Sequence, residues 1–279
     1  MTLKTRRLRV PPLPIHVGVS PAIRPDDAPH PAGRQRGIDR LIGVLDLLQR
    51  RRQPMGAGDI ARALGAPRST IYEIVERLMD AQMLESSGAE GQVFFGRAMH
   101  LFGAAYLHGD AAMRRIGEAL DALSADTGMT VQCCGRRGDK YVVLECRDGA
   151  GPFRITSEIG VEVPLPWTAS GRLLLGHMSD EAIRAFVPPE DFHLPDGGVL
   201  PIRTFLDDVE TARREGFSET TGLANSFTWC QAVPIFGRDG VAEFTLCFVL
   251  PVDSAAKQRA RCLDLLLARA QHLSHTDTG

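Results

Sequence analysis

Apolar residues recur at intervals of three and four in three consecutive stretches between residues 38 and 78. This spacing places them on one face of a helix and predicts helices over 38–52, 59–64 and 67–80. The apolar face of the first helix consists of Ile38, Leu41, Ile42, Leu45 and Leu48. Pro67 is expected at the first position of the third helix, where proline is well tolerated.

A two-stranded hairpin is expected directly after the third helix. Residues 84–86 and 93–95 flank a turn rich in serine and glycine at 87–91. A tight turn at Gly65-Ala66 separates the second helix from the third. Three helices with this turn, followed by a hairpin, indicate a winged helix-turn-helix.

The next segment, 98–109 (AMHLFGAAYLHG), is apolar on more than one face of a helix. Such a helix needs a cover, because exposure of an apolar surface of this extent to water is unfavourable. We expect a linker helix that packs against its own copy in a homodimer. The alternative is that it docks on its own chain.

The rear half alternates between short strands and helices. Strands are expected over 130–136, 141–146, 229–236 and 241–249, and helices over 112–125, 169–178, 180–187, 202–215 and 255–273. Hairpins separated by helices indicate an α+β domain with a mostly antiparallel sheet flanked by helices.

The N-terminal residues 1–36 contain seven prolines and seven basic residues without a helical or alternating period, which predicts a disordered tail. Three interpretations of this tail are open. It contacts DNA loosely through its positive charge, it is a solvated tail without a function, or the start codon is mis-assigned. The expected organisation is this tail, a winged helix-turn-helix over 37–97, a linker helix over 98–111 and a second domain over 112–279.

Charge differs between the two halves. Residues 1–109 carry 15 basic and 10 acidic side chains, whereas residues 110–279 carry 17 and 24. This asymmetry suggests that the front half meets an acidic partner. The front domain itself, 37–96, has 7 basic and 8 acidic residues, so we expect modest DNA affinity per copy and tight binding only through two half-sites.

Several classes of protein are excluded by the sequence. It has no stretch of 18 apolar residues and no signal-peptide pattern, so we expect no membrane association and a cytoplasmic protein. Six cysteines in 279 residues, with no CxxC pair, do not predict disulfides or a metal site. No P-loop or G-x-G-x-x-G is present, and no cofactor is expected.

Beyond the tail, the chain resembles the IclR family of bacterial transcriptional regulators over about residues 38–273. In the front domain the likeness rests on Ile60-Ala61, Gly65 and PRSTIYEIVERL (67–78). In the rear domain it rests on VPLPWTASGRLLLG (163–176), REGF (214–217) and WCQAVPIFGRDGV (229–241). The resemblance implies a non-enzymatic regulator that binds double-stranded operator DNA, becoming nucleoid-associated, and forms dimers or tetramers. It also implies a small-molecule sensor domain with a GAF-like sheet.

Residues at the start of a recognition helix face the major groove. The residues predicted to contact DNA are Arg62, Arg68, Ser69, Thr70, Tyr72, Glu73 and Arg77. Family members often have a basic residue where this chain has Glu73. That carboxylate either accepts a hydrogen bond from a cytosine amino group or forms a capping pair with Thr70.

The resemblance also implies a pocket between the sheet and the TA-x-G loop. The residues predicted to bind an organic, carboxylic or aromatic effector are Trp167, Thr168, Ala169, Ser170, Gly171, Thr220, Trp229, Cys230 and Gln231. Free N–H groups at the helix start favour an anion. Thr220 replaces an acid that is frequent in the family, and Gly222-Leu223 replaces an acidic pair, so the ligand of another member cannot be transferred. Core packing is the alternative for both tryptophans.

Two other functions remain as alternatives at this stage. A thiol- or metal-responsive DNA-binding sensor would use Cys133, Cys134 and Cys230, although free cysteines are more often small buried hydrophobes. A hydrolase is less favoured, because Ser170 lies in A-S-G and not in G-x-S-x-G.

Overall fold

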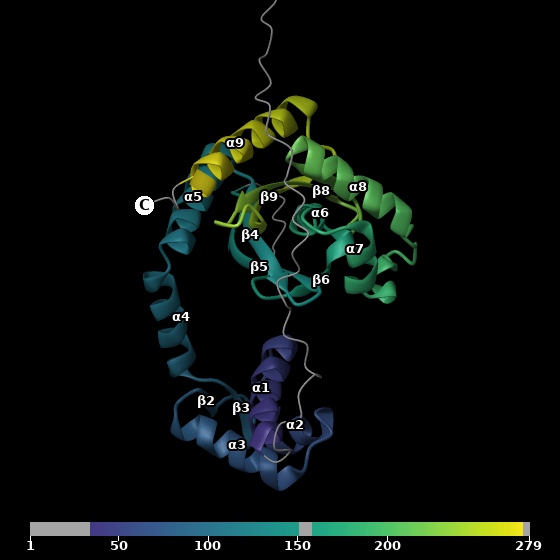
Figure 1. Ribbon diagram of the computed structural model, residues 1–279. Helices are drawn as coiled ribbons and strands as arrows, with labels where there is room; N and C mark the ends of the chain where they lie inside the picture. Colours follow the sequence, from purple (N-terminus) through teal and green to yellow (C-terminus); the bar gives the residue numbers. More distant parts are fainter. Residues whose placement is uncertain (1–33, 151–157, 276–279) are drawn as a thin grey trace, which may run out of the picture. The chain divides into compact units, whose positions relative to one another are not determined.

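The computed structural model describes residues 34–150 and 158–275. They form two compact units, a front unit up to Ala111 and a rear unit from Ala112 onward (Figure 1). Most of the expected tail falls on residues 1–33, which lie outside the described residues. The first helix begins at Arg34, earlier than predicted, so residues 34–36 are helical.

The front unit contains helices and a small sheet in the predicted order, with one additional strand. Its elements are α1 (Arg34–Arg51), β1 (Met55–Gly56), α2 (Ala57–Ala63), α3 (Arg68–Asp80), β2 (Leu84–Ser86), β3 (Gln92–Phe95) and α4 (Arg97–Gly109). The sheet is antiparallel with strand order β1-β3-β2. The two-residue strand β1 is too short to have a periodicity of its own.

The core of the front unit forms where the apolar faces of the three helices and the hairpin meet. Its fully buried members include Leu48 of α1, Ile60 of α2, Ile71 of α3 and Leu84 of β2. Pro67 precedes α3 as its N-cap and is not its first residue. Its φ of −58° and ψ of 132° are extended geometry, which the fixed proline ring also favours.

The rear unit is built around a six-stranded antiparallel sheet. Its elements are α5 (Ala111–Thr127), β4 (Thr130–Arg137), β5 (Lys140–Arg147), β6 (Glu162–Pro164), η1 (Leu165–Trp167), α6 (Ala169–Leu174), α7 (Asp180–Phe186), η2 (Pro189–Phe192), α8 (Ile202–Glu215), β7 (Ser218–Thr221), β8 (Thr228–Phe236), β9 (Ala242–Pro251) and α9 (Ala256–His275). The strand order is β6-β5-β4-β9-β8-β7.

Helices cover both faces of this sheet. One face packs against α6, α7 and α8, and we call it the α6 face. The other packs against α5 and α9, which lie together in Figure 1, and we call it the α9 face. The two edge strands β6 and β7 were not predicted, because their sequences, EVP and SETT, are short and poor in apolar residues.

Candidate functional sites

The exposed face of α3 carries most of the residues predicted to contact DNA. Ile71, Val75 and Leu78 are buried on its inner face. Helical spacing therefore turns the remaining side chains outward. Those exposed are Arg68, Ser69, Tyr72, Glu73, Glu76 and Arg77, whereas Thr70 is partly buried. Tyr72 is 57% exposed, so most of its aromatic side chain faces solvent.

Glu73 does not form the capping pair that the sequence allowed. A capping box would require Thr70 at the N-cap, but α3 begins at Arg68 with Pro67 as its N-cap. Thr70 is thus the third helical residue. The Glu73 carboxylate stays on the outer face.

Arg62, the remaining residue predicted to contact DNA, lies on α2, the helix that precedes α3 in the sequence. Its guanidinium donates a hydrogen bond of 2.8 Å to Asp59 of the same helix. Both side chains are largely exposed, so the pair contributes little stability and leaves Arg62 accessible.

In the rear unit, polar side chains occupy the middle of the α6 face, where a sheet normally packs apolar groups. The Tyr141 hydroxyl donates to Gln132 Oε1 at 3.0 Å and lies 2.9 Å from the Cys134 thiol. All three residues are buried. Burial raises the pKa of Cys134 to about 12, so this thiol stays protonated.

Helix α6 contributes a hydroxyl to the same face. Thr245 Oγ1 of β9 donates a hydrogen bond of 2.8 Å to Ser170 Oγ, and neither residue has measurable exposure. At the start of α6, Thr168 Oγ1 caps the helix by accepting from the Gly171 N–H at 2.9 Å. Only the N–H groups of Ala169 and Ser170 are left for another acceptor in this first turn.

Cys230 lies at the β7 side of the α6 face. The neighbouring side chains of Cys247, Thr228 and Thr220, Cys247 first, lower the pKa of the Cys230 thiol and outweigh the opposing effect of burial. The pKa of the Cys247 thiol is raised, first by the neighbouring Cys230 and then by burial, and its Sγ donates to the Phe248 carbonyl oxygen at 3.5 Å.

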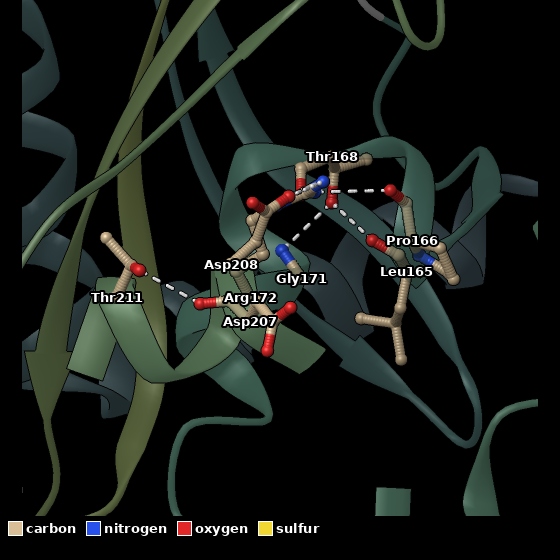
Figure 2. A network of polar contacts seen from close by, with 8 residues as sticks. All are labelled: Leu165, Pro166, Thr168, Gly171, Arg172, Asp207, Asp208 and Thr211. Carbon is tan, nitrogen blue, oxygen red and sulfur yellow. Dashed lines mark hydrogen bonds and ion pairs between the residues drawn. The ribbon is translucent and has the colours of Figure 1, made fainter. Parts of the chain in front are cut away.

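A buried arginine fixes the segment that leads into α6. Arg172 is 2% exposed, and its Nη1 donates to the carbonyl oxygens of Pro166 and Thr168 at 3.2 and 2.9 Å. Its Nε and Nη2 donate to Asp208 of α8 at 3.1 and 2.9 Å. Figure 2 shows that Arg172 thereby joins the 165–168 turn to α8.

Comparison with protein families identifies both units. Residues 37–88 match the IclR helix-turn-helix domain. Residues 104–275 match the C-terminal domain of the bacterial transcriptional regulator IclR, and this match alone spans more than half of the chain. The chain belongs to the IclR family.

Individual IclR proteins agree with this assignment. The HTH-type transcriptional repressor AllR of Salmonella typhimurium is 24% identical over 192 residues, which cover 66% of this chain and 68% of AllR. AllR of Escherichia coli K12 is 23% identical over 184 residues, with the same coverage.

Solved IclR structures share the fold. An IclR regulator from Alicyclobacillus acidocaldarius has a TM-score of 0.78 at 19% identity, covering 86% of this chain and 97% of its own. An IclR homologue from Microbacterium hydrocarbonoxydans, solved in complex with 4-hydroxybenzoate, has a TM-score of 0.71 at 22% identity, covering 85% and 97%.

The family and fold establish the general function. This chain is a DNA-binding transcriptional regulator with a C-terminal effector-binding domain, and not an enzyme. In the described ranges 34–150 and 158–275, no helix is both long and apolar enough to cross a membrane.

The residues predicted to bind the IclR effector fall on two faces of the sheet. Cys230 and Thr220, paired across β7 and β8, share the α6 face with Ser170. Trp229 and Gln231 alternate with Cys230 along β8 and so belong to the α9 face. There the Arg259 guanidinium lies 3.9 Å from the centre of the Trp229 ring, and Gln231 Nε2 donates to Glu219 at 2.6 Å.

Trp167 remains close to the α6 face but is held by the chain itself. It belongs to η1, and its indole N–H donates to the Asp191 carbonyl oxygen at 2.8 Å. Only the apolar part of the partly buried ring is available to a ligand.

Several residues of the α6 face were not predicted from the sequence: Gln132, Tyr141, Thr228, Thr245 and Cys247. A signal for them exists in the strand patterns. On β9, for example, Thr245 and Cys247 alternate with Leu246 and Phe248. This alternation places a hydroxyl and a thiol on the same face of the strand.

The metal-sensing alternative has no site in the described parts of the chain. No group of three or more His, Cys, Asp or Glu side chains there is arranged to hold a metal ion. Cys133 also packs on the α9 face, opposite Cys134. A hollow of about 20 Å³ on that face, between α5, α9 and the β8–β9 hairpin, has room for about one water molecule but not for an organic effector.

Proposed function

We propose that this IclR regulator binds a palindromic operator as a homodimer, with the outer face of α3 from each copy in one major groove. Arg68, Ser69 and Tyr72 are the exposed groups at the helix start, where base contacts are made in helix-turn-helix proteins. Arg68 suits a guanine edge, and Ser69 suits a phosphate. Glu73 and Arg77, one and two turns further on, complete the surface with Arg62 and Thr70.

The α4 helix supports the dimer. None of its residues is buried within the chain, and its exposed apolar side chains are Leu101, Phe102, Tyr106 and Leu107. Leu101 and Phe102 are 66% and 59% exposed. A second α4 would cover this surface, and two half-sites would raise the modest affinity of one near-neutral front unit. A dimer of such dimers is compatible with the same interface.

We further propose that the effector is an organic anion with an aromatic or apolar body and that it binds on the α6 face. The observation that carries this proposal is the buried hydroxyl pair of Ser170 and Thr245 between α6 and the sheet. Hydrogen-bonding groups in an otherwise apolar core give a ligand both orientation and apolar contact.

Charge favours an anion there. The acidic residue of β7, Glu219, is turned to the opposite face and bonded to Gln231, and Thr220 occupies the ligand side. The remaining N–H groups at the start of α6, those of Ala169 and Ser170, also favour an anion. The complex of a structural neighbour with 4-hydroxybenzoate supports an aromatic carboxylate as the first class to test.

The DNA-binding proposal is tested on an operator fragment selected from random sequence with the purified protein. Arg68→Ala is expected to weaken binding by about 1–3 kcal/mol and to relax preference at one base pair. Arg114→Ala, which removes an exposed arginine of the rear unit, is the matched control and should bind like wild type. An unchanged affinity in Arg68→Ala would contradict this use of α3.

The effector proposal is tested by thermal shift and calorimetry with 4-hydroxybenzoate, related aromatic carboxylates and their neutral methyl esters. The acids should stabilise the protein and the esters should not. Ser170→Trp, which fills the site, should abolish the shift, whereas Trp229→Phe on the α9 face should retain it. Binding that survives Ser170→Trp but not a change on the α9 face would place the effector elsewhere.

A further inference from the structure

Asp191 connects three parts of the rear unit. It belongs to η2, at the start of a loop over residues 189–200 that we call the strap. Its side chain is only 7% exposed, and its carboxylate accepts a hydrogen bond of 2.6 Å from the ammonium of Lys140 on β5. Its backbone carbonyl oxygen accepts the indole N–H of Trp167 at 2.8 Å. One residue therefore joins β5 and the strap to η1, the turn that leads into α6.

The strap is packed firmly against the rest of the rear unit. Phe192 is buried in the core of the α6 face, and the centre of its ring lies 5.8 Å from that of Phe205, edge to face. Leu200 is buried in the same core, and its N–H donates to the Phe192 carbonyl oxygen at 2.9 Å. These contacts give Asp191 a defined position, from which it can orient a neighbouring side chain.

The backbone on both sides of Trp167 is held independently of Asp191. Arg172 donates to the carbonyl oxygens of Pro166 and Thr168, the residues before and after the tryptophan. The main freedom left to Trp167 is rotation of its side chain. The hydrogen bond to Asp191 restricts this rotation, because it fixes the N–H edge of the indole.

Lys140 is a charged partner of Asp191 in a partly buried setting. Burial lowers the pKa of Lys140, but hydrogen bonds to Asp191 and Asp139 outweigh this effect and raise the pKa above its usual value. The Lys140 ammonium therefore stays charged. Asp191 is much less exposed than Asp139, so water screens its attraction to Lys140 less. Breaking such a shielded pair is costly, and it keeps the strap in place beside β5.

We propose that Lys140 and Asp191 position the Trp167 ring as one wall of the effector site and thereby select effectors with a flat aromatic body. This inference rests on the proposed function, in which the effector binds on the α6 face. Trp167 immediately precedes Thr168, the N-cap of α6, and is therefore close in the chain to the N–H groups proposed to hold the anion. A ring of fixed orientation stacks on a flat ligand better than on a puckered one.

The positioning of Trp167 is tested by fluorescence without any effector. The chain has two tryptophans, so Trp229→Phe leaves Trp167 as the reporter. In this background, Asp191→Ala should increase the quenching of Trp167 by acrylamide and lower its fluorescence anisotropy. Glu190→Ala, at the exposed acidic residue next to Asp191 in η2, is the matched control and should leave both unchanged. Unchanged quenching and anisotropy in Asp191→Ala would overturn the positioning role.

Substitutions of Lys140 separate the effect of the ion pair from a folding defect. Lys140→Met should change the fluorescence of Trp167 as Asp191→Ala does, and Lys140→Arg should retain the wild-type signal. The double variant Lys140→Met/Asp191→Ala should behave like either single variant, because each removes the same pair. Circular dichroism verifies folding, and the two Lys140 variants decide the question if Asp191→Ala does not fold. Additive effects in the double variant would overturn the pairing.

Selection of an aromatic effector is tested by calorimetry with 4-hydroxybenzoate and its saturated analogue, trans-4-hydroxycyclohexanecarboxylate. We expect Asp191→Ala to weaken binding of 4-hydroxybenzoate by about two- to tenfold, the loss expected for one aromatic contact, and to affect the saturated acid much less. In a Trp167→Leu background, Asp191→Ala should change neither affinity further. A purely structural role would weaken both acids equally, and that result would overturn the selectivity.

The effector proposal and this inference fail in different ways. If neither acid binds wild type, the proposed effector class and the selectivity role are overturned together, while the fluorescence of Trp167 still decides the positioning role. If 4-hydroxybenzoate binds wild type and Asp191→Ala equally well, the effector proposal stands and the selectivity role is overturned.

Discussion

Gly171 occupies a position where the backbone of η1 approaches α6 too closely for any side chain. A Cβ at this residue would lie 2.1 Å from the Leu165 carbonyl oxygen and 3.0 Å from Thr168 Oγ1. Because the first of these atoms belongs to the backbone, relief requires the turn itself to move. Glycine therefore allows the turn at 165–168 to pack against α6, beside the effector site that we propose.

Gly171→Ala is accordingly expected to destabilise the rear unit by about 1–3 kcal/mol, as overpacking does. Urea unfolding followed by circular dichroism measures this loss. Gly103→Ala on α4 is the control, because no described atom lies within 4 Å of its new methyl group and the change should cost little. Equal stability of wild type and Gly171→Ala would contradict the close approach.

His177 gives the rear unit a pH-dependent stability. Among the described residues, its buried Nδ1 has no hydrogen-bond partner, and burial, followed by the nearby cation of Arg136, lowers the pKa of His177 below 6.5. Arg213 acts in the same direction, whereas Asp239 and the backbone of Leu174 oppose the shift. His177 therefore binds a proton more readily in the unfolded chain than in the folded chain. The free energy of unfolding decreases as the pH falls through about 6.5.

We expect His177→Gln to lose less stability than wild type between pH 7.5 and 5.5, measured by chemical denaturation at each pH. His193→Gln, at an exposed histidine of the same unit, is the comparison and should follow the wild-type profile. A parallel profile in His177→Gln would assign the acid sensitivity to other groups.

At the scale of elements, Arg172 makes α6 and α8 one structural unit. Its guanidinium is buried and Asp208 is its acidic partner, although Asp208 is itself 43% exposed. Removing one member of such a pair leaves an uncompensated buried charge, whereas replacing both can be nearly neutral. The arginine also donates to two backbone carbonyl groups, so its position determines the shape of the turn before α6.

Asp208→Ala should destabilise the rear unit by about 1–3 kcal/mol, a range lowered from that of fully buried pairs because water screens Asp208. The double variant Arg172→Met/Asp208→Ala should regain part of this loss in a denaturation cycle. Asp207→Ala removes the exposed partner of Arg203 and should change stability by about 0.5 kcal/mol or less. Additive losses in the cycle would show that the two groups do not interact.

The sequence predicted long elements better than it predicted faces and edges. The helices over 38–52 and 202–215 have strong apolar periodicity, and α1 and α8 correspond to them. Strands β6 and β7 carry almost no such signal and are held by pairing with β5 and β8. A strand in isolation cannot show that it lies at the edge of a larger sheet.

The ligand-site prediction grouped neighbours along the chain, and β8 separated them. Adjacent residues of a strand point to opposite faces, so Trp229 and Cys230 cannot share one site. Period-two alternation was available in the sequence and would have separated them. The pairing of Ser170 with Thr245 was not predictable, because it joins residues far apart in sequence through a helix packed on a sheet.

At the scale of the whole molecule, the exposed side chains of α4 predict the oligomeric state. The double variant Leu101→Glu/Phe102→Glu places two charges on that surface and should be monomeric in sedimentation at micromolar concentration. Its affinity for a full operator should fall to that for one half-site. His100→Glu adds a charge at an exposed polar position of α4 and should remain dimeric. A dimer that survives the double variant would place the interface on another surface.

Communication between the two units requires that effector binding favour one arrangement of the two front units of a dimer over another. The covalent connection between the units runs through α4 and α5, which meet at Asp110, the extended C-cap of α4. Insertion of a Gly-Ser-Gly-Ser segment after Gly109 leaves α4 and the proposed effector site intact but makes this junction flexible.

An effector found by the thermal-shift screen should change operator affinity about 5–150-fold in wild type. In the insertion variant, which should still bind effector and operator, the change should be close to zero. Operator titrations with and without effector measure this coupling, and insertion of the same segment between Gly237 and Arg238, in the β8–β9 turn, controls for added length. Full coupling in the variant with the flexible junction would show that the signal passes through contacts between the units and not through the α4–α5 connection.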